Sequence, residues 1–157
     1  MTALVLGVGN PDRGDDGIGP HVARRVAALA LPGVRVVERV EPTDLPDAWE
    51  DAETVVIVDA AHTGRPPGTV LVRDAVARPL PAGGGSGGTH AFGVTEAVEL
   101  ARALGRLPAA LTVVSVEAGE VGIGQPLSDA ARAAVTTAAQ TVVTALEPVA
   151  GDTRGQS

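Results

Sequence analysis

The sequence predicts an α/β fold in which a largely parallel sheet carries helices on both of its faces. Segments with the pattern of buried strands alternate with segments of helical periodicity along most of the 157 residues. Such an alternation requires right-handed crossovers, which place helices on both faces of a mostly parallel sheet. Apolar residues make up 45% of the chain and include only one Phe, one Trp and no Tyr. A core of Val, Leu, Ile and Ala suits buried parallel strands.

Five segments are expected to form strands. Two of them, Ala3–Val8 and Thr54–Val58, are apolar on both faces, and we therefore expect them at the centre of the sheet. We expect the second of these strands to stop at Asp59. The other three predicted strands are Val34–Val40, Thr69–Arg73 and Leu111–Val116.

The helices are predicted from apolar residues that recur at helical spacing. The first begins near Pro20, a residue suited to a first helical turn, and continues through the run HVARRVAALAL. A short helix is expected at Asp44–Glu50 and a longer one at Phe92–Leu104. Ser128 is a good N-cap for the last helix, Asp129–Leu146.

The length suits one domain, which we expect to span residues 1–147. The tail at residues 148–157, PVAGDTRGQS, is rich in turn-forming and polar residues, and we expect it to be disordered. The segment Pro79–Gly88, PLPAGGGSGG, is expected to be a flexible loop within the domain.

Charge and cysteine content exclude several classes of function. The formal net charge of -7 opposes binding to nucleic-acid phosphates and to anionic lipid. The absence of cysteine excludes disulfides, thiolate zinc sites and a cysteine nucleophile, and it is compatible with a cytoplasmic location. No segment has the length and apolar character of a membrane-spanning helix or the pattern of a signal peptide.

Acidic residues follow two of the predicted strands at their carboxyl ends, where open parallel sheets bind ligands. The loop after the first strand contains Asp12, Asp15 and Asp16, and the central strand ends at Asp59. A later glycine-rich loop contains His90. Two carboxylates and an imidazole from separate loops can bind a divalent metal with open coordination positions. Oxygen and imidazole ligands suit Ni, Zn, Mn and Fe, so the ligand types do not determine which of these metals would bind.

The first loop also has an alternative interpretation. Gly7-x-Gly9 after a strand resembles half of a dinucleotide-binding fingerprint, but Asp12 stands where the third glycine is required. Asp15 and Asp16 would lie where the pyrophosphate binds, at the helix N-terminus. Because these carboxylates would repel a phosphate, we discount dinucleotide binding.

Several blocks of the sequence resemble the hydrogenase-maturation endopeptidases. They are LVLGVGNPDRGDDGIGP, VIVDAAHTGRPPGT, THAFGVTEAVELARALG and, more loosely, VEAGEVGIGQPLSDA. Together they cover roughly residues 3–146 in order and with similar spacing. The first block is fairly specific to the family, and the next two are specific mainly in combination.

The resemblance implies a three-layer α/β/α sandwich and a metal site formed by Asp16, Asp59 and His90. It also implies that the protein removes the C-terminal extension of a nickel-iron hydrogenase large-subunit precursor after nickel insertion. Nickel would then be supplied by this precursor, although another divalent metal also suits the ligands. Asp16 and Asp59 are the candidate catalytic residues, since either carboxylate can accept a proton.

Each candidate residue also has a structural interpretation. Asp15 and Asp16 could simply complement the helix dipole, and for Asp15 this is the favoured interpretation. Asp59 could cap the turn after its strand. His62, three residues after Asp59, is expected at the surface. The alternative function is a non-catalytic nucleotide- or metal-binding module, which would not cut a peptide.

Overall fold

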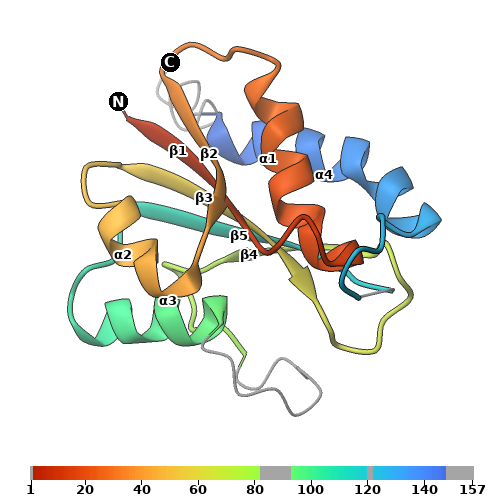
Figure 1. The fold of residues 1–157 in the computed structure, drawn as a ribbon. Coiled ribbons are helices and arrows are strands. Elements are labelled where there is room, and N and C mark those ends of the chain that lie inside the picture. Colours follow the sequence, from red (N-terminus) through yellow and green to blue (C-terminus); the bar gives the residue numbers. More distant parts are fainter. Residues whose placement is uncertain (1, 82–92, 120–121, 148–157) are drawn as a thin grey trace.

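Five strands form one sheet through the middle of the molecule (Figure 1). The computed structural model describes residues 2–81, 93–119 and 122–147. Strand order in the sheet is β2-β1-β3-β5-β4, and all neighbouring pairs are parallel except β4 and β5. The strands are β1 (Ala3–Val8), β2 (Val34–Val40), β3 (Thr54–Ala61), β4 (Val70–Asp74) and β5 (Ala110–Glu117). The mostly parallel sheet and the internal positions of Ala3–Val8 and Thr54–Val58 are therefore confirmed.

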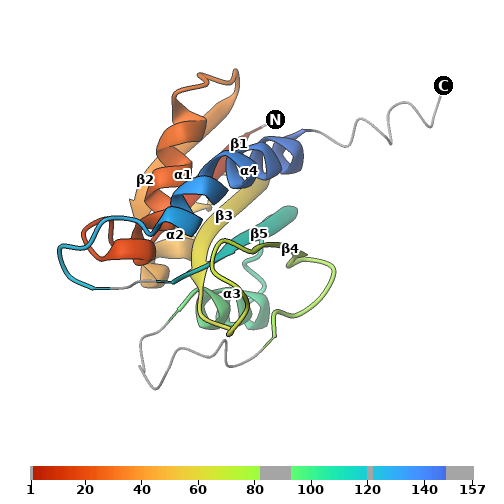
Figure 2. The same ribbon diagram turned by 90° about the vertical axis from the view of Figure 1, so that its right-hand side faces the viewer.

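Helices cover both faces of the sheet, so the predicted three-layer α/β/α sandwich is confirmed (Figure 2). One layer contains α1 (Ile18–Ala27) and α4 (Asp129–Leu146), and the other contains α2 (Leu45–Ala48) and α3 (Val94–Ala103). Short 3-10 turns precede α1 at Gly14–Gly17, called η1, and α2 at Pro42–Asp44, called η2. None of the described helices has the length and apolar character needed to cross a membrane.

Side chains of β3 alternate between the two helical layers, as the period of a strand requires. Val56 and Val58 pack in the core below α1 and α4, whereas Val55 and Ile57 pack in the core below α2 and α3. The expectation that this strand stops at Asp59 was wrong, because β3 continues to Ala61. The reason is the length of its neighbour: β5 pairs with β3 in register out to its own last residue. Asp59 therefore shares a face with Val55 and Ile57.

Helix boundaries agree with the sequence patterns to within a few residues. The last helix and its N-cap are confirmed, since Ser128 Oγ accepts a hydrogen bond of 3.2 Å from the backbone N–H of Ala131. The first helix begins at Ile18 rather than Pro20, and the short second helix is shorter than predicted. Phe92, most of the glycine-rich loop and the tail at 148–157 lie outside the described residues.

The first turn of α1 lies directly against the backbone of the two central strands. A Cβ atom on Gly19 would lie 2.4 Å from the carbonyl oxygens of both Val8 and Val58. A Cβ atom on Gly7 would likewise lie 2.7 Å from the carbonyl oxygen of Gly19. Helix and sheet can approach this closely only because both positions lack side chains. The contact fixes η1, which precedes α1, at the carboxyl edge of β1 and β3.

The close approach at Gly19 predicts that Gly19→Ala destabilises the protein by about 3 kcal/mol, because the added methyl group must displace backbone atoms. Gly64→Ala is the matched control. Gly64 has a positive φ of 86° but nothing within 4 Å of its added Cβ, so only backbone strain of about 1 kcal/mol is expected. Urea unfolding of both variants measures the difference. Equal losses in the two variants would show that the helix can move away from the strands at no cost.

Candidate metal and active site

Asp16 is held at the carboxyl end of β1 by the backbone of its own loop. Gly9 has a φ of 131°, and a Cβ atom there would lie 1.9 Å from the carbonyl oxygen of Asp16. The chain thus folds back on itself between these two residues. The backbone N–H of Asn10 then donates a hydrogen bond of 2.9 Å to Oδ2 of Asp16. The carboxylate of Asp16 is partly exposed, which leaves it accessible to a ligand.

Asp59 and Asp16 lie close enough for their charges to interact. Burial raises the pKa of Asp59 to about 7, a backbone hydrogen bond from Ala60 opposes this shift, and the charge of Asp16 adds to it. Desolvation and a like charge both disfavour an ionised carboxylate. A strongly raised pKa at the mouth of a parallel sheet is typical of functional sites, because structural carboxylates usually gain partners that lower it. The two carboxylates are therefore within range of each other's charge, and their convergence on one metal ion stays a prediction.

Asp15 has a different task from its neighbour Asp16. Its side chain is fully buried and accepts three hydrogen bonds of 2.7 Å each, from the backbone N–H groups of Gly119 and Ser128 and from the Ser128 hydroxyl. An acid that only complements a helix dipole would be exposed, and a metal ligand would have oxygen atoms available to the ion, so this buried and hydrogen-bonded carboxylate fits neither role. The carboxylate instead joins the loop between β1 and α1 to the segment that leads from β5 into α4. The choice between Asp15 and Asp16 as the ligand therefore favours Asp16.

Glu117 is a second buried carboxylate at this edge, and the sequence analysis missed it. It ends β5 opposite Ala61, and 3% of the residue is exposed. Its oxygens accept hydrogen bonds from the backbone N–H of Thr63 at 2.8 Å, the Thr63 hydroxyl at 2.6 Å and the backbone N–H of Gly64 at 3.2 Å. An acidic residue directly after a buried strand was the available signal, the same one that identified Asp59. Glu117 fixes the loop that follows Asp59.

Of His90 and His62, the two histidines considered for the site, only His62 is among the described residues. His90, the third predicted ligand, lies outside the described residues, and the only described residues near it in sequence are those that begin α3. Because α3 is followed by β5, which starts at the amino edge, the first turn of α3 points toward the carboxyl edge. His62 is partly exposed in the loop after β3. Within residues 2–81, 93–119 and 122–147, no three potential ligand side chains form a metal-binding group.

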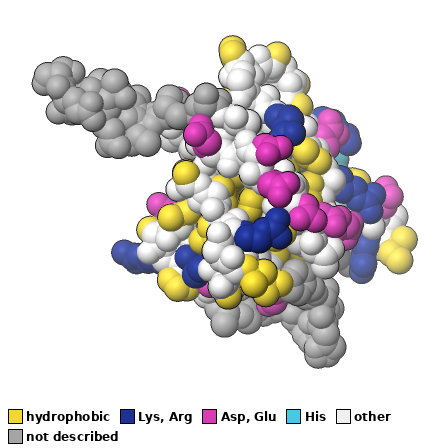
Figure 3. Space-filling model, turned by 90° about the vertical axis from the view of Figure 1, so that its left-hand side faces the viewer, with side chains coloured by type: hydrophobic (Ala, Val, Ile, Leu, Met, Phe, Trp, Pro, Cys, Tyr) yellow, Lys and Arg dark blue, Asp and Glu magenta, His cyan; other side chains and the backbone are white. Residues whose placement is uncertain are grey.

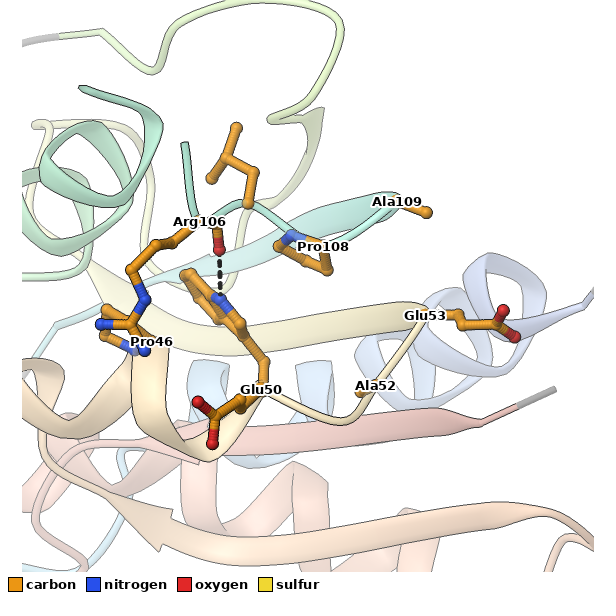
Figure 4. A pocket seen from close by; sticks show the side chains of 9 residues that line it. Pro46, Glu50, Ala52, Glu53, Arg106, Pro108 and Ala109 are labelled. Atoms are coloured by element: carbon orange, nitrogen blue, oxygen red, sulfur yellow. Dashed lines mark hydrogen bonds between the residues drawn. The ribbon is translucent and has the colours of Figure 1, made fainter. Parts of the chain in front are cut away.

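A cavity at the opposite edge of the sheet has a different character. Its volume is about 350 Å³, and its lining includes Trp49, whose indole Nε1–H donates a hydrogen bond of 2.8 Å to the carbonyl oxygen of Arg106. Figure 4 shows this lining, with Pro46, Glu50 and Arg106 among the labelled residues. Glu53 and Ala109, which precede β3 and β5, also line it. The view toward this edge shows acidic and basic side chains interspersed (Figure 3). The cavity is therefore remote from Asp16 and Asp59 and does not extend their site.

The alternative of dinucleotide binding gains no support from the first loop. The space that a glycine opens for a pyrophosphate in such proteins is filled here, because Gly9 packs against the backbone of Asp16. The carboxylate of Asp16 also accepts a hydrogen bond from the backbone N–H of Asn10, so this N–H is not available to a phosphate. The lack of a side chain at Gly9 thus allows the backbone of Asp16 to pack against it, and no room is left there for a pyrophosphate.

The buried contacts of Asp15 predict that Asp15→Asn destabilises the protein by about 3 kcal/mol. Each carboxylate oxygen accepts a backbone N–H, so an amide group in either orientation would bring its own NH₂ against a donor. Asp16→Asn is the matched control, because Asp16 accepts one hydrogen bond that an amide oxygen can keep. Its expected effect is about 1 kcal/mol or less in chemical unfolding. A loss that is larger for Asp16→Asn would contradict these assigned roles.

The raised pKa of Asp59 predicts a pH-dependent gain in stability for Asp59→Asn in metal-free protein. The folded pKa is about 7 and the unfolded pKa is near 4, so the folded state binds the extra proton between these values. The wild type should therefore lose stability relative to Asp59→Asn as the pH rises from about 4 to 7, and the difference should level off above that range. Thermal melts with a chelator test this. A melting-temperature difference independent of pH would contradict the raised pKa of this carboxylate.

Comparison with known proteins identifies the family. The family model for hydrogenase maturation protease, HycI, matches residues 31–145. No curated protein sequence matched significantly. The HybD hydrogenase maturation protease of Thermococcus kodakarensis is 26% identical, with 94% of this chain and 100% of that chain covered and a TM-score of 0.71. An endopeptidase from Escherichia coli is 25% identical, with 93% and 92% covered and a TM-score of 0.76.

The hydrogenase maturating endopeptidase HybD of Escherichia coli shares the fold, with a TM-score of 0.72, 24% identity and coverage of 93% of this chain and 92% of that chain. The family model covers more than half of the sequence, including β3, β5 and Asp59. The chain therefore belongs to the hydrogenase maturation protease family and is a hydrolase that acts on peptide bonds.

Proposed function

We propose that this protein removes the C-terminal extension of a nickel-iron hydrogenase large-subunit precursor after nickel has been inserted, and that Asp16, Asp59 and His90 bind a divalent metal during cleavage. Maturation proteases act on hydrogenase large-subunit precursors, and membership of this family supports the proposal. The nickel belongs to the precursor and is part of the substrate. The proposed place of cleavage is the cytoplasm, in agreement with the absence of cysteine.

The observation that carries the proposal is the pairing of Asp16 with Asp59 at the carboxyl edge of the two central strands. The charge of Asp16 contributes to the raised pKa of Asp59, so a cation between them would relieve their repulsion. Their oxygen atoms fit a divalent ion, and an imidazole from His90 would extend the set to mixed oxygen and nitrogen ligands. The residues present thus suit a metal that also contacts a substrate.

The acidic side chains at this edge have two kinds of role in the proposal. Asp59 and Asp16 provide negative charge at a fixed place, and either carboxylate can accept a proton from an attacking water. Asp15 and Glu117 do not contact the substrate but hold the loops beside the site. A divalent ion at this position would supply Lewis-acid polarisation of the peptide carbonyl.

Intact-mass measurement tests the proposal directly. The protein is incubated with a nickel-loaded large-subunit precursor and, in parallel, with the same precursor lacking nickel. We expect the mass of the nickel-loaded precursor to fall by that of its C-terminal extension, while the nickel-free precursor keeps its mass. A precursor that stays uncut in both samples would instead support the alternative, a binding module without peptidase activity.

Asp59→Asn should abolish cleavage of the nickel-loaded precursor while leaving the fold intact. Asparagine keeps the shape of the side chain but removes its charge, and a neutral amide oxygen is a poor ligand for a divalent transition metal. Loss of one ligand should lower the cleavage rate by at least about 100-fold, and the same assay measures it. The control is Asp51→Asn, which neutralises an exposed acid in the turn before β3 and should cleave at the wild-type rate. Wild-type activity in Asp59→Asn would remove Asp59 from the site.

A further inference from the structure

Ile123 is the most exposed large hydrophobic residue in the part of the chain that the structure describes. Its exposed fraction is 83%, compared with 62% for the next residue, Leu104. Ile123 lies in the segment between β5 and α4, and it is separated from Ser128, the N-cap of α4, by four residues. The remaining exposed large hydrophobics are Leu29, Val37, Val72, Val76 and Leu100.

Ile123 occupies the corner of a tight turn. The backbone N–H of Gln125 donates a hydrogen bond of 3.0 Å to the carbonyl oxygen of Gly122, which closes a four-residue turn. Gly124, the third residue of the turn, has a φ of 79°, as turns of this kind require. The second position, where Ile123 lies, accepts most residues. The turn itself therefore gives no reason for a large apolar side chain at its corner.

This turn is joined to the loop that carries Asp16. The backbone N–H of Gly124 donates a hydrogen bond of 2.7 Å to the carbonyl oxygen of Asp12, and the N–H of Gly14 donates one of 2.8 Å to the carbonyl oxygen of Gln125. The buried carboxylate of Asp15 holds Ser128 a few residues further on. Ile123 is thus presented at the carboxyl edge by backbone that is fixed to the site. The other exposed hydrophobics lie on the outer strands, on α3 or in segments that follow β4, α1 or α3.

We propose that Ile123 is a specificity-determining contact for the hydrogenase precursor, and that its side chain inserts into an apolar depression on the precursor surface beside the segment to be cut. This inference rests on the proposed function. The precursor is the favoured occupant because the turn is hydrogen-bonded to the loop that carries Asp16, which presents Ile123 at the same edge of the sheet as the proposed site. A second copy of this chain seated there would instead cover the carboxyl edge and exclude the substrate.

The test compares the cleavage kinetics of Ile123→Ala, Ile123→Val and wild type with nickel-loaded precursor. Truncation of an apolar interface contact weakens association, so Ile123→Ala should raise KM by about 5- to 10-fold and leave kcat within about twofold. Ile123→Val, which keeps a branched apolar side chain, should stay within about twofold of wild-type KM. The control is Leu104→Ala, which removes the next most exposed of the described large hydrophobics, after α3, and should leave KM unchanged.

The possible outcomes separate the inference from the proposed function. Wild-type protein that cuts no precursor overturns the proposed function and this inference with it. Active wild type together with an unchanged KM for Ile123→Ala overturns the inference alone. An equal rise in KM for Leu104→Ala also overturns it, because the effect would then not depend on the position beside the site.

Discussion

The close contact between the first turn of α1 and the carboxyl ends of β1 and β3 is the constraint on which the site depends. Gly19 allows the helix backbone to approach the carbonyl oxygens of Val8 and Val58 at a distance that no side chain would permit. The 3-10 turn η1 is continuous with α1, so its position follows from this contact. Asp16 is consequently near enough to Asp59 for their charges to interact, although 42 intervening residues separate them in the sequence.

Acidic residues at this edge divide into two groups with opposite energetic consequences. Asp15 and Glu117 are buried, and each accepts three hydrogen bonds that join neighbouring loops. Charge-assisted hydrogen bonds of this kind stabilise the folded state. Asp59 instead has a pKa raised by burial and by Asp16, so its ionised form opposes folding near neutral pH. Asp15 and Glu117 thus stabilise the loops around Asp59, a carboxylate whose ionised form is destabilising, and such a trade is common at functional sites.

Most of the fold could be predicted from the sequence because continuous apolar runs and helical periodicity mark buried elements directly. The central positions of β1 and β3 followed from their composition. The length of β3 could not be predicted, since it depends on pairing with β5, which lies far along the chain. The sequence therefore located Asp59 at the correct edge of the sheet but gave it the wrong local structure, and its role in the site stays a prediction.

The roles of Asp15 and Asp16 show a further limit. The two residues are adjacent and identical, and only the hydrogen bonds to Gly119 and Ser128, more than one hundred residues later, distinguish them. For His90, a histidine in a glycine-rich loop, the resemblance of the surrounding block to the family is what favoured the role of a ligand over that of an ordinary loop residue.

The affinity of the protein for a divalent metal tests the central claim, the proposed metal site, most directly. Isothermal titration of the wild type and of His90→Ala with Zn²⁺ compares their dissociation constants at one pH. Loss of a direct ligand should weaken binding by at least about 10-fold, since even changes around ligands have effects of this size. Equal affinities in the two proteins would contradict a site that joins His90 to Asp16 and Asp59.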